Sequence, residues 1–256
     1  MNITVESIES FLLILVRLSA FIFTAPIFSN SQIPRKVKAC FSVFISMIIY
    51  NTVAVELPAY SDVISFAILV MQEAIVGLIL GFIISACMYI VNCAGRLIDM
   101  EMGLSMANMM DPSTRIQASI TGAFYTQMVL LLLLITNMHY YILRAIVDSF
   151  KHVPLGGVVF HAGLYEIMQS FLVDFFVIGF RIVLPVFAAM LIVNVVLGVL
   201  ARIAPQMNMF VVGMQLKIFV GLVILYIIVS TLPMVSDFIA VEMKKYINII
   251  MKALAP

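Results

Sequence analysis

Charged side chains are scarce in this sequence. Asp, Glu, Lys and Arg make up 11% of its 256 residues, hydrophobic residues make up 64%, and the mean hydropathy is +1.19. Soluble domains contain roughly 25% charged residues, so this composition excludes a soluble globular protein. The formal net charge is only +1. Because the chain lacks the basic excess that attracts phosphate backbones, we expect no nucleic-acid partner.

Residues that carry chemistry are also few. The three cysteines, Cys40, Cys87 and Cys93, lie in or beside apolar stretches without paired spacing, which favours small core residues over a disulfide or metal site. The three histidines are His139, His152 and His161, and they form no HxxxH or HExxH pattern. The phosphate-binding pattern GxxxxGK(S/T) is absent from the sequence. We therefore predict no enzymatic activity, no cofactor and no metal ion, and expect other proteins to power any transport.

Six long apolar regions follow one another along the chain. They cover residues 8–28, 39–55, 63–91, 120–135 with an extension toward 150, 163–200 and 209–234. A helix satisfies its backbone hydrogen bonds internally, so these regions are stable in lipid as α-helices. The N-terminal segment is acidic and lacks an evident cleavage site, so we expect it to persist as the first helix. The sequence predicts an all-α, multi-pass membrane protein, with residues 1–256 forming a single polytopic domain in contact with lipid.

Two features do not fit simple perpendicular spans. Region 63–91 would be about 43 Å long as a helix, against a hydrocarbon core of about 30 Å. The basic loop 32–38 indicates the cytoplasmic side, yet six spans would place the lysine-rich tail outside, against the positive-inside rule. Pro185 removes a helix hydrogen bond and can split the fifth region into two shorter helices. Either this proline adds a span, or some helices do not cross the bilayer.

The C-terminal segment 236–256 has a different pattern. Apolar residues recur there every three or four positions, at Phe238, Ile239, Met243, Ile247 and Ile250. This period predicts an amphipathic helix. The helix would serve either as an anchor at the membrane interface or as a docking helix for a partner.

Four charged residues lie inside apolar stretches, where charge is costly. They are Arg17, Glu73, Asp174 and Arg181. They are candidates for a proton or ion pathway; alternatively, each pairs with a charge on a neighbouring helix and fixes the packing. Asp174 and Arg181 are seven residues apart on one helix face, which predicts that both point into a protein interior. Gly77 and Gly81 form a GxxxG spacing near Glu73, which favours close helix packing there over ion binding.

Two segments interrupt the apolar pattern. Residues 94–119 read AGRLIDMEMGLSMANMMDPSTRIQAS, a predicted loop bounded by glycines and by Pro112, whose methionines can form a compliant seal or fill a core. Residues 197–210 read LGVLARIAPQMNMF. There Gly198 permits close approach, Arg202 can bond free carbonyls, and Pro205 ends the helix. The alternative for this second segment is an ordinary cytoplasmic turn.

Together these segments resemble the FliR family, the export-gate component of bacterial flagellar and related type III secretion systems. The resemblance covers essentially the whole chain. It is carried by RLSAFIFTAPIF and IPRKVK near the start, EAIVGLILGF, AGRLIDMEMGLSMANMMDPSTR, HYYILRAIVDSFKHVPLG, and PVFAAMLIVNVVLGVLARIAPQMNMFVVGMQLKI. The stretch NMFVVGMQLK is more similar to the flagellar branch than to the virulence-secretion branch.

The resemblance implies a place in a protein assembly. Members of this family join, as one copy, several FliP-like and FliQ-like subunits in a conical gate of stacked helical hairpins. Unfolded flagellar subunits leave through this gate across the inner (cytoplasmic) membrane at the flagellar basal body, driven by an export ATPase and the proton-motive force. Much of such a gate lies above the bilayer plane, which accounts for the long helices and for the conflict in the charge count.

The resemblance also implies that, within the lumen-facing segment 94–119, the loop matching 104–117 plugs the closed channel. From the residues of that loop we expect three methionines to block ions in the resting state, and Gly103 and Pro112 to be its hinge limits. The predicted plug and gating residues are Gly103, Leu104, Met106, Met109, Met110, Asp111, Pro112 and Arg115. A hairpin tip held against neighbouring subunits is predicted at Gly198, Arg202, Pro205, Gln206 and Asn208.

Two other functions are alternatives. An ion-coupled secondary transporter for a small solute would use Glu73, Asp174 and Arg181 near the midplane of the membrane. It predicts inverted internal repeats, and the sequence contains no convincing pair of matched halves. A purely structural assembly subunit would seed a ring of partners, and its loop would seal nothing.

Overall fold

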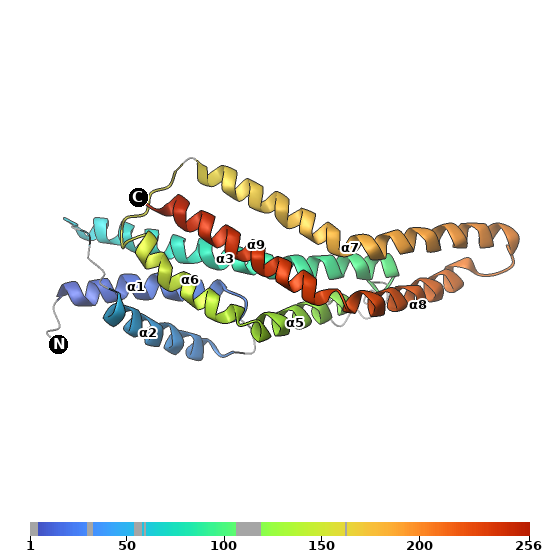
Figure 1. Ribbon diagram of the computed structural model, residues 1–256, viewed down its shortest axis with the longest axis horizontal. Coiled ribbons are helices and arrows are strands. Elements are labelled where there is room, and N and C mark those ends of the chain that lie inside the picture. The colour runs from blue at the N-terminus through green and yellow to red at the C-terminus, as the bar shows by residue number, and fades with distance from the viewer. Residues whose placement is uncertain (1–4, 30–32, 54–57, 59, 106–118, 162) are drawn as a thin grey trace. The chain divides into compact units, whose positions relative to one another are not determined.

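A computed structural model describes residues 5–29, 33–53, 58, 60–105, 119–161 and 163–256 (Figure 1). All regular structure among these residues is helical, so the protein is an all-α membrane protein as predicted. The helices are α1 (Val5–Thr24), α2 (Arg35–Thr52), α3 (Val63–Met102), α5 (Ile120–Ile135), α6 (Met138–His152), α7 (Gly163–Ile203), α8 (Met209–Val229) and α9 (Leu232–Leu254).

The six predicted apolar regions all appear as helices, with one division and one extension. The fourth region divides at Asn137, which adopts the left-handed conformation (φ 58°) between α5 and α6. Helix α3 continues through Met102, so the first part of segment 94–119 is helix rather than loop. Apolar contacts explain the extension, because Ala94, Ile98 and Met102 lie on one face of α3 and are fully buried.

Pro185 does not divide the fifth region. Helix α7 runs without interruption from Gly163 to Ile203 with Pro185 inside it. A proline removes one backbone hydrogen bond, and a helix in an apolar environment tolerates that loss when neighbouring groups satisfy the freed carbonyl. Among the described residues four helices (α1, α3, α7 and α8) are long and apolar enough to cross a membrane, or five if α5 and α6 form one broken span.

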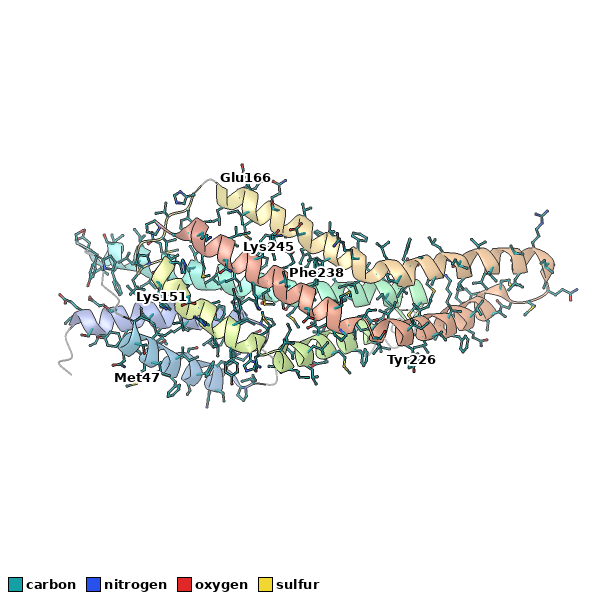
Figure 2. The ribbon with its side chains drawn as sticks, viewed as in Figure 1. Met47, Lys151, Glu166, Tyr226, Phe238 and Lys245 are labelled. Atoms are coloured by element: carbon teal, nitrogen blue, oxygen red, sulfur yellow. The ribbon has the colours of Figure 1, made fainter. Side chains whose placement is uncertain are left out.

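The chain forms two compact units. Unit 1 comprises Met1–Cys87, Leu134–Leu172 and Ala240–Pro256, and unit 2 comprises Met88–Leu133 and Val173–Ile239. In unit 1, α1 and α2 pack side by side (Figure 1). Helix α2 turns a polar face inward, with Ser42 and Ser46 buried, whereas Phe44 and Met47 face outward (Figure 2). A helix with this inverted pattern is suited to lipid or to another subunit rather than to water.

The C-terminal helix α9 is amphipathic as predicted, but its apolar face is not free. Met243, Ile247 and Ile250 are fully buried in the core of unit 1. The ring of Tyr246 packs edge-on against Phe171 with centroids 4.9 Å apart, and the Val159 N–H donates to the Leu254 carbonyl at 3.3 Å. Most of the face that we expected to anchor in the membrane interface or dock a partner is therefore covered by the chain itself, although Phe238 at its start is 37% exposed.

Helices α7 and α8 contribute little to the core. Only 28% of the most apolar stretch of α7 and 11% of that of α8 are buried within the chain. Large apolar side chains such as Ile192, Phe219 and Tyr226 are exposed on them (Figure 2). Of the cysteines expected to fill the core, Cys87 is buried, but Cys40 and Cys93 are exposed, and all three are free thiols.

Candidate functional site

A buried ion pair joins α1 to α3 in unit 1. The Arg17 Nε donates to Glu73 Oε2 at 2.5 Å, and both side chains are completely buried. The Arg17 guanidinium also lies 4.3 Å from the ring centre of Phe150. The prediction that these charges pair across neighbouring helices is confirmed for Arg17 and Glu73. Because a buried charge is costly without a partner, each of these residues requires the other.

The same ion pair also binds the C-terminal end of α6 and the residues that follow it. The Arg17 Nη1 donates to the carbonyl oxygens of Ser149 at 3.2 Å and Val153 at 3.0 Å. The Ser149 carbonyl also accepts from the Val153 N–H at 2.9 Å, so Arg17 adds a second donor there at the C-terminal end of the helix. The second Glu73 oxygen, Oε1, accepts from the Gly156 N–H at 3.0 Å. Gly156 has φ +67°, and a Cβ there would clash with Pro58 and Leu69. Three segments distant in the sequence thus meet at one charge pair.

Close packing of α1 on α3 surrounds this network. A Cβ added at Gly77 would overlap the Arg17 carbonyl oxygen, and one at Gly81 would lie 2.7 Å from the Thr24 Cβ. The Ser85 hydroxyl donates to the Thr24 carbonyl. The GxxxG prediction of close helix contact is therefore confirmed, and its partner is α1.

A second buried carboxylate lies in unit 2, where the chain leaves α3 and returns at α5. Asp99 Oδ2 accepts from the Ser119 hydroxyl at 2.7 Å, and the Thr121 N–H points to both carboxylate oxygens at 3.3 Å. The Ser119 Oγ in turn accepts from the Gly122 N–H at 2.8 Å. Ser119 therefore caps α5, and Asp99 holds that cap from one turn before the end of α3.

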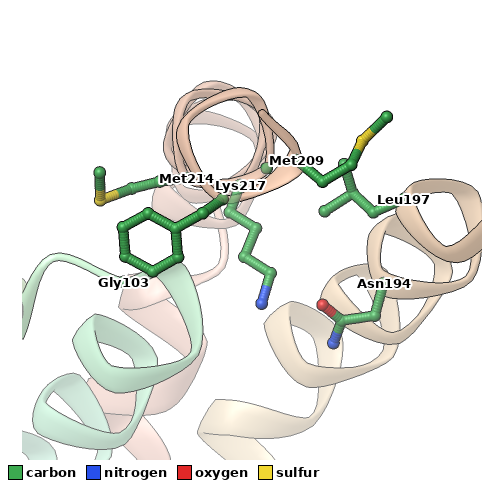
Figure 3. A pocket seen from close by; sticks show the side chains of 8 residues that line it. Gly103, Asn194, Leu197, Met209, Met214 and Lys217 are labelled. Atoms are coloured by element: carbon green, nitrogen blue, oxygen red, sulfur yellow. The ribbon is translucent and has the colours of Figure 1, made fainter. Parts of the chain in front are cut away.

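A pocket opens beside the end of α3 in the same unit. Gly103, with φ +80°, forms one side, and the α7 and α8 helices form the others. Figure 3 shows Lys217 of α8 and Asn194 of α7 extending into it. Its remaining walls are apolar, from Leu197, Met209, Phe210 and Met214. Nearby, Met102 packs against Gly221 of α8, where a Cβ would overlap the methionine side chain.

The predicted hairpin tip joins α7 to α8. Helix α7 ends at Ile203, residues 204–208 turn, and the Asn208 side chain accepts from the Phe210 N–H at 3.2 Å as the cap of α8. Arg202, Gln206 and Asn208 are all exposed. A Cβ at Gly198 would meet no atom within 4 Å, so the close approach predicted there does not occur within the described chain.

The other predicted residues have different placements. Arg181 is exposed rather than interior, and its guanidinium lies 6.0 Å from the ring centre of Phe238; Asp174 is half-buried. Leu104 is also half-buried. Six of the predicted plug residues lie outside the described residues: Met106, Met109, Met110, Asp111, Pro112 and Arg115. Among the described residues no group of three His, Cys, Asp or Glu side chains is placed to hold a metal ion.

The sequence matches bacterial export proteins, family 1, over residues 8–243. The flagellar biosynthetic protein FliR of Bacillus subtilis is 35% identical over 236 residues, covering 91% of this chain and 90% of that protein. FliR of Escherichia coli is 31% identical over 228 residues, covering 88% and 84%. The chain belongs to the FliR family. This FliR-family chain is accordingly an integral membrane component of the flagellar export apparatus, where it works with other export proteins.

Family membership favours the export component among the functional classes. The matching family model is that of bacterial export proteins, and the matched relatives are flagellar biosynthetic proteins FliR. In this FliR-family chain, Glu73, which a coupled transporter would use, is instead fully engaged by Arg17 and Gly156. The structure also adds residues that had no role assigned from the sequence: Asp99, Ser119, Ser149 and Gly156. Ser119 had a local signal, since a serine directly before an apolar helix is a common cap; the partners of the others are distant in sequence.

Proposed function

We propose that this chain joins, as one copy, FliP-like and FliQ-like subunits to form the channel through which unfolded flagellar proteins cross the inner membrane at the flagellar basal body. The observation that carries this proposal is the exposure of α7 and α8 in a chain of the FliR family. These helices are among the most apolar in the protein, yet they remain largely uncovered by the chain itself. Surfaces of this kind are stable only against lipid or other subunits.

Helix length supports an assembly that extends beyond the bilayer. Helices α3 and α7 have 40 and 41 residues. At 1.5 Å per residue each is about 60 Å long, roughly twice the hydrocarbon thickness. Tilt alone accommodates only part of this excess. The remaining length fits a gate whose helices are covered by partner subunits outside the membrane.

The same proposal includes a plug, formed by residues 104–117. Gly103 and Ser119 flank this segment, and both lie at the end of α3, where Asp99 contacts Ser119. Because the residues that flank the segment lie close together, the segment can form a loop that enters a channel. In the proposal, Met106, Met109 and Met110 block ions in the resting state, because methionine side chains adapt to irregular gaps. Gly103 and Pro112 limit the moving part.

Replacing 104–117 with a Gly/Ser linker of equal length tests the plug. In cells producing the whole complex, we expect membrane conductance to rise, since glycine and serine lack the large side chains that would block ions. The control replaces Tyr165, which is 75% exposed and lies outside the proposed plug, with serine. The complex is also purified from each strain to verify that all subunits are present.

Unchanged conductance in an intact complex would remove the plug and leave a purely structural assembly subunit. Purification of the chain without export-gate subunits would overturn the assembly itself.

A further inference from the structure

The outward face of α2 in unit 1 is apolar over most of its length and basic at its start. We propose that this face contacts the acyl chains of the membrane, and that Arg35 and Lys36 bind the phosphate groups of anionic lipids at its edge. No charged side chain is exposed on α2 between Lys36 and Asn51. The exposed residues of that stretch are Val37, Ala39, Cys40, Val43, Phe44, Met47 and Ile48. This inference is independent of the plug and gives a role to a helix that the proposed channel does not use.

The small polar residues of α2 face the protein rather than its surroundings. Ser42 is 1% exposed and Ser46 is fully buried, whereas Met47 faces outward (Figure 2). Both hydroxyls donate within the helix, Ser42 to the Lys38 carbonyl at 2.9 Å and Ser46 to the Ser42 carbonyl at 2.7 Å, so neither needs water. In a membrane, the contacts between helices are enriched in small residues, commonly four positions apart. The serines therefore mark the protein side of α2, and the bulky apolar side chains mark its lipid side.

The neighbour of α2 holds it at membrane depth. Helix α2 packs side by side with α1, a candidate span of 20 residues, and the rings of Phe11 and Tyr50 meet edge-on with centroids 6.4 Å apart. At 1.5 Å per residue, Lys36 and Asn51 are about 23 Å apart along the axis of α2. This apolar band is shorter than the hydrocarbon core of about 30 Å, and the long side chains at its basic end can reach the interface. Helix α2 is not among the four candidate spans of the described residues, which fits a helix whose start lies in the headgroup layer.

The charge at the start of α2 selects the kind of lipid. Arg35 and Lys36 are both exposed, and among the described residues neither forms an ion pair. A basic residue near an anionic membrane surface raises affinity for that surface about fivefold. An anionic lipid carries a phosphate group next to its acyl chains, so a single molecule matches both the basic start of the face and its apolar continuation. A protein partner would have to supply separate acidic and apolar groups at the same spacing.

Cys40 is a native reporter on this face, because it is an exposed free thiol. The complete export complex, with its other exposed cysteines replaced by serine, is labelled at Cys40 with a fluorophore and reconstituted in vesicles. Quenching is measured with phosphatidylcholine or phosphatidylglycerol that carries bromine on its acyl chains, and with iodide on both sides of the vesicle. Arg144→Cys in a chain with Cys40→Ser gives the reference for a position in water, since the Arg144 side chain is 81% exposed.

We expect brominated lipid to quench the Cys40 label and iodide not to quench it. Phosphatidylglycerol should quench at a mole fraction at least about fivefold lower than phosphatidylcholine. Arg35→Gln with Lys36→Gln should abolish this preference, and each single glutamine variant should lose part of it. Arg35→Lys with Lys36→Arg is the matched control, which keeps both charges and should keep the preference. Subunit recovery is measured for each variant.

The outcomes separate lipid from the other possible neighbours of α2. Quenching of the Cys40 label by iodide would place the face in water, and protection from both iodide and brominated lipid would place it against a protein subunit; either result overturns the lipid contact. Equal quenching by the two lipids in the unaltered chain would overturn the headgroup site. So would a preference for phosphatidylglycerol that survives the glutamine variants in an intact complex. The linker variant tests the plug separately, so failure of either proposal leaves the other standing.

Discussion

At the scale of single residues, Arg17 organises unit 1. It is the largest fully buried side chain of the described residues, and its guanidinium connects α1 to Glu73 on α3 and to the last carbonyls of α6. Such an arrangement is stable only as a whole. The desolvation cost of each ion is offset by the opposite charge and by the hydrogen bonds around it, so loss of one partner leaves an uncompensated buried charge.

Arg17→Ala should therefore lower the free energy of unfolding by about 3–5 kcal/mol. Arg17→Lys should also destabilise the protein, because a lysine has no planar group that can donate both to Glu73 and to the α6 carbonyls. Thermal unfolding of the purified complex in detergent measures the effect. Arg144→Ala is the control: the Arg144 side chain is 81% exposed and pairs with Asp148 at 3.5 Å, so its loss should cost less than about 1 kcal/mol.

A double substitution separates pairing from packing. Arg17→Met together with Glu73→Leu replaces both charges with apolar groups. This double variant should be more stable than Arg17→Met alone or Glu73→Leu alone. Equal losses for Arg17→Ala and Arg144→Ala would show that the buried network carries no special stability. A double variant less stable than both single variants would show that the charges themselves are indispensable.

At the scale of elements, the α7–α8 hairpin presents its turn to the outside. Arg202, Gln206 and Asn208 are exposed there, beside apolar neighbours such as Met207 and Phe210 that are also exposed. An arginine among apolar groups is a frequent anchor in protein interfaces. The Asn208 cap shapes the turn, since it satisfies the Phe210 N–H at the start of α8.

Arg202→Ala should reduce the recovery of partner subunits with this chain, and the export of flagellar proteins, by about tenfold. Pull-down of the tagged chain with quantitation of the other subunits checks this, and swimming motility reports export. The exposed arginine in Arg144→Ala again serves as the control and should leave both unchanged. Normal motility with an intact complex in the Arg202→Ala strain would make the tip an ordinary turn.

Helices could be predicted from the sequence far better than the contacts between them. Runs of apolar residues reveal where α3 and α7 lie, because burying such runs requires a helix whatever its neighbours are. The partners of Arg17 and Asp99 depend on which helices meet, and no local period records that. The predicted break at Pro185 was wrong. The proline does remove a backbone hydrogen bond, but the favourable free energy of the long apolar helix around it is larger than that loss. The apolar face of α9 was visible in the sequence, whereas its burial inside unit 1 was a tertiary property.

At the scale of the whole molecule, the distribution of apolar surface sets what the chain needs from its surroundings. In unit 1 Met243, Ile247 and Ile250 of α9 are fully buried, whereas in unit 2 large apolar side chains of α8 are not: Phe219 is 67% exposed and Tyr226 is 83% exposed. Lipid and partner subunits would both cover such residues. They differ in specificity, because a protein partner matches the shape of a side chain and lipid does not.

This difference gives the last prediction. Replacing both Phe219 and Tyr226 with serine should leave the chain in the membrane, since α1, α3 and α7 still qualify as spans, but should abolish copurification with FliP-like and FliQ-like subunits. Phe219→Leu with Tyr226→Phe keeps the surface apolar and is the matched control. Partner contact predicts that the serine variant loses the complex and that the control retains most of it. If the serine variant assembles normally, α8 faces lipid, and the surface that holds the partners lies elsewhere on the chain.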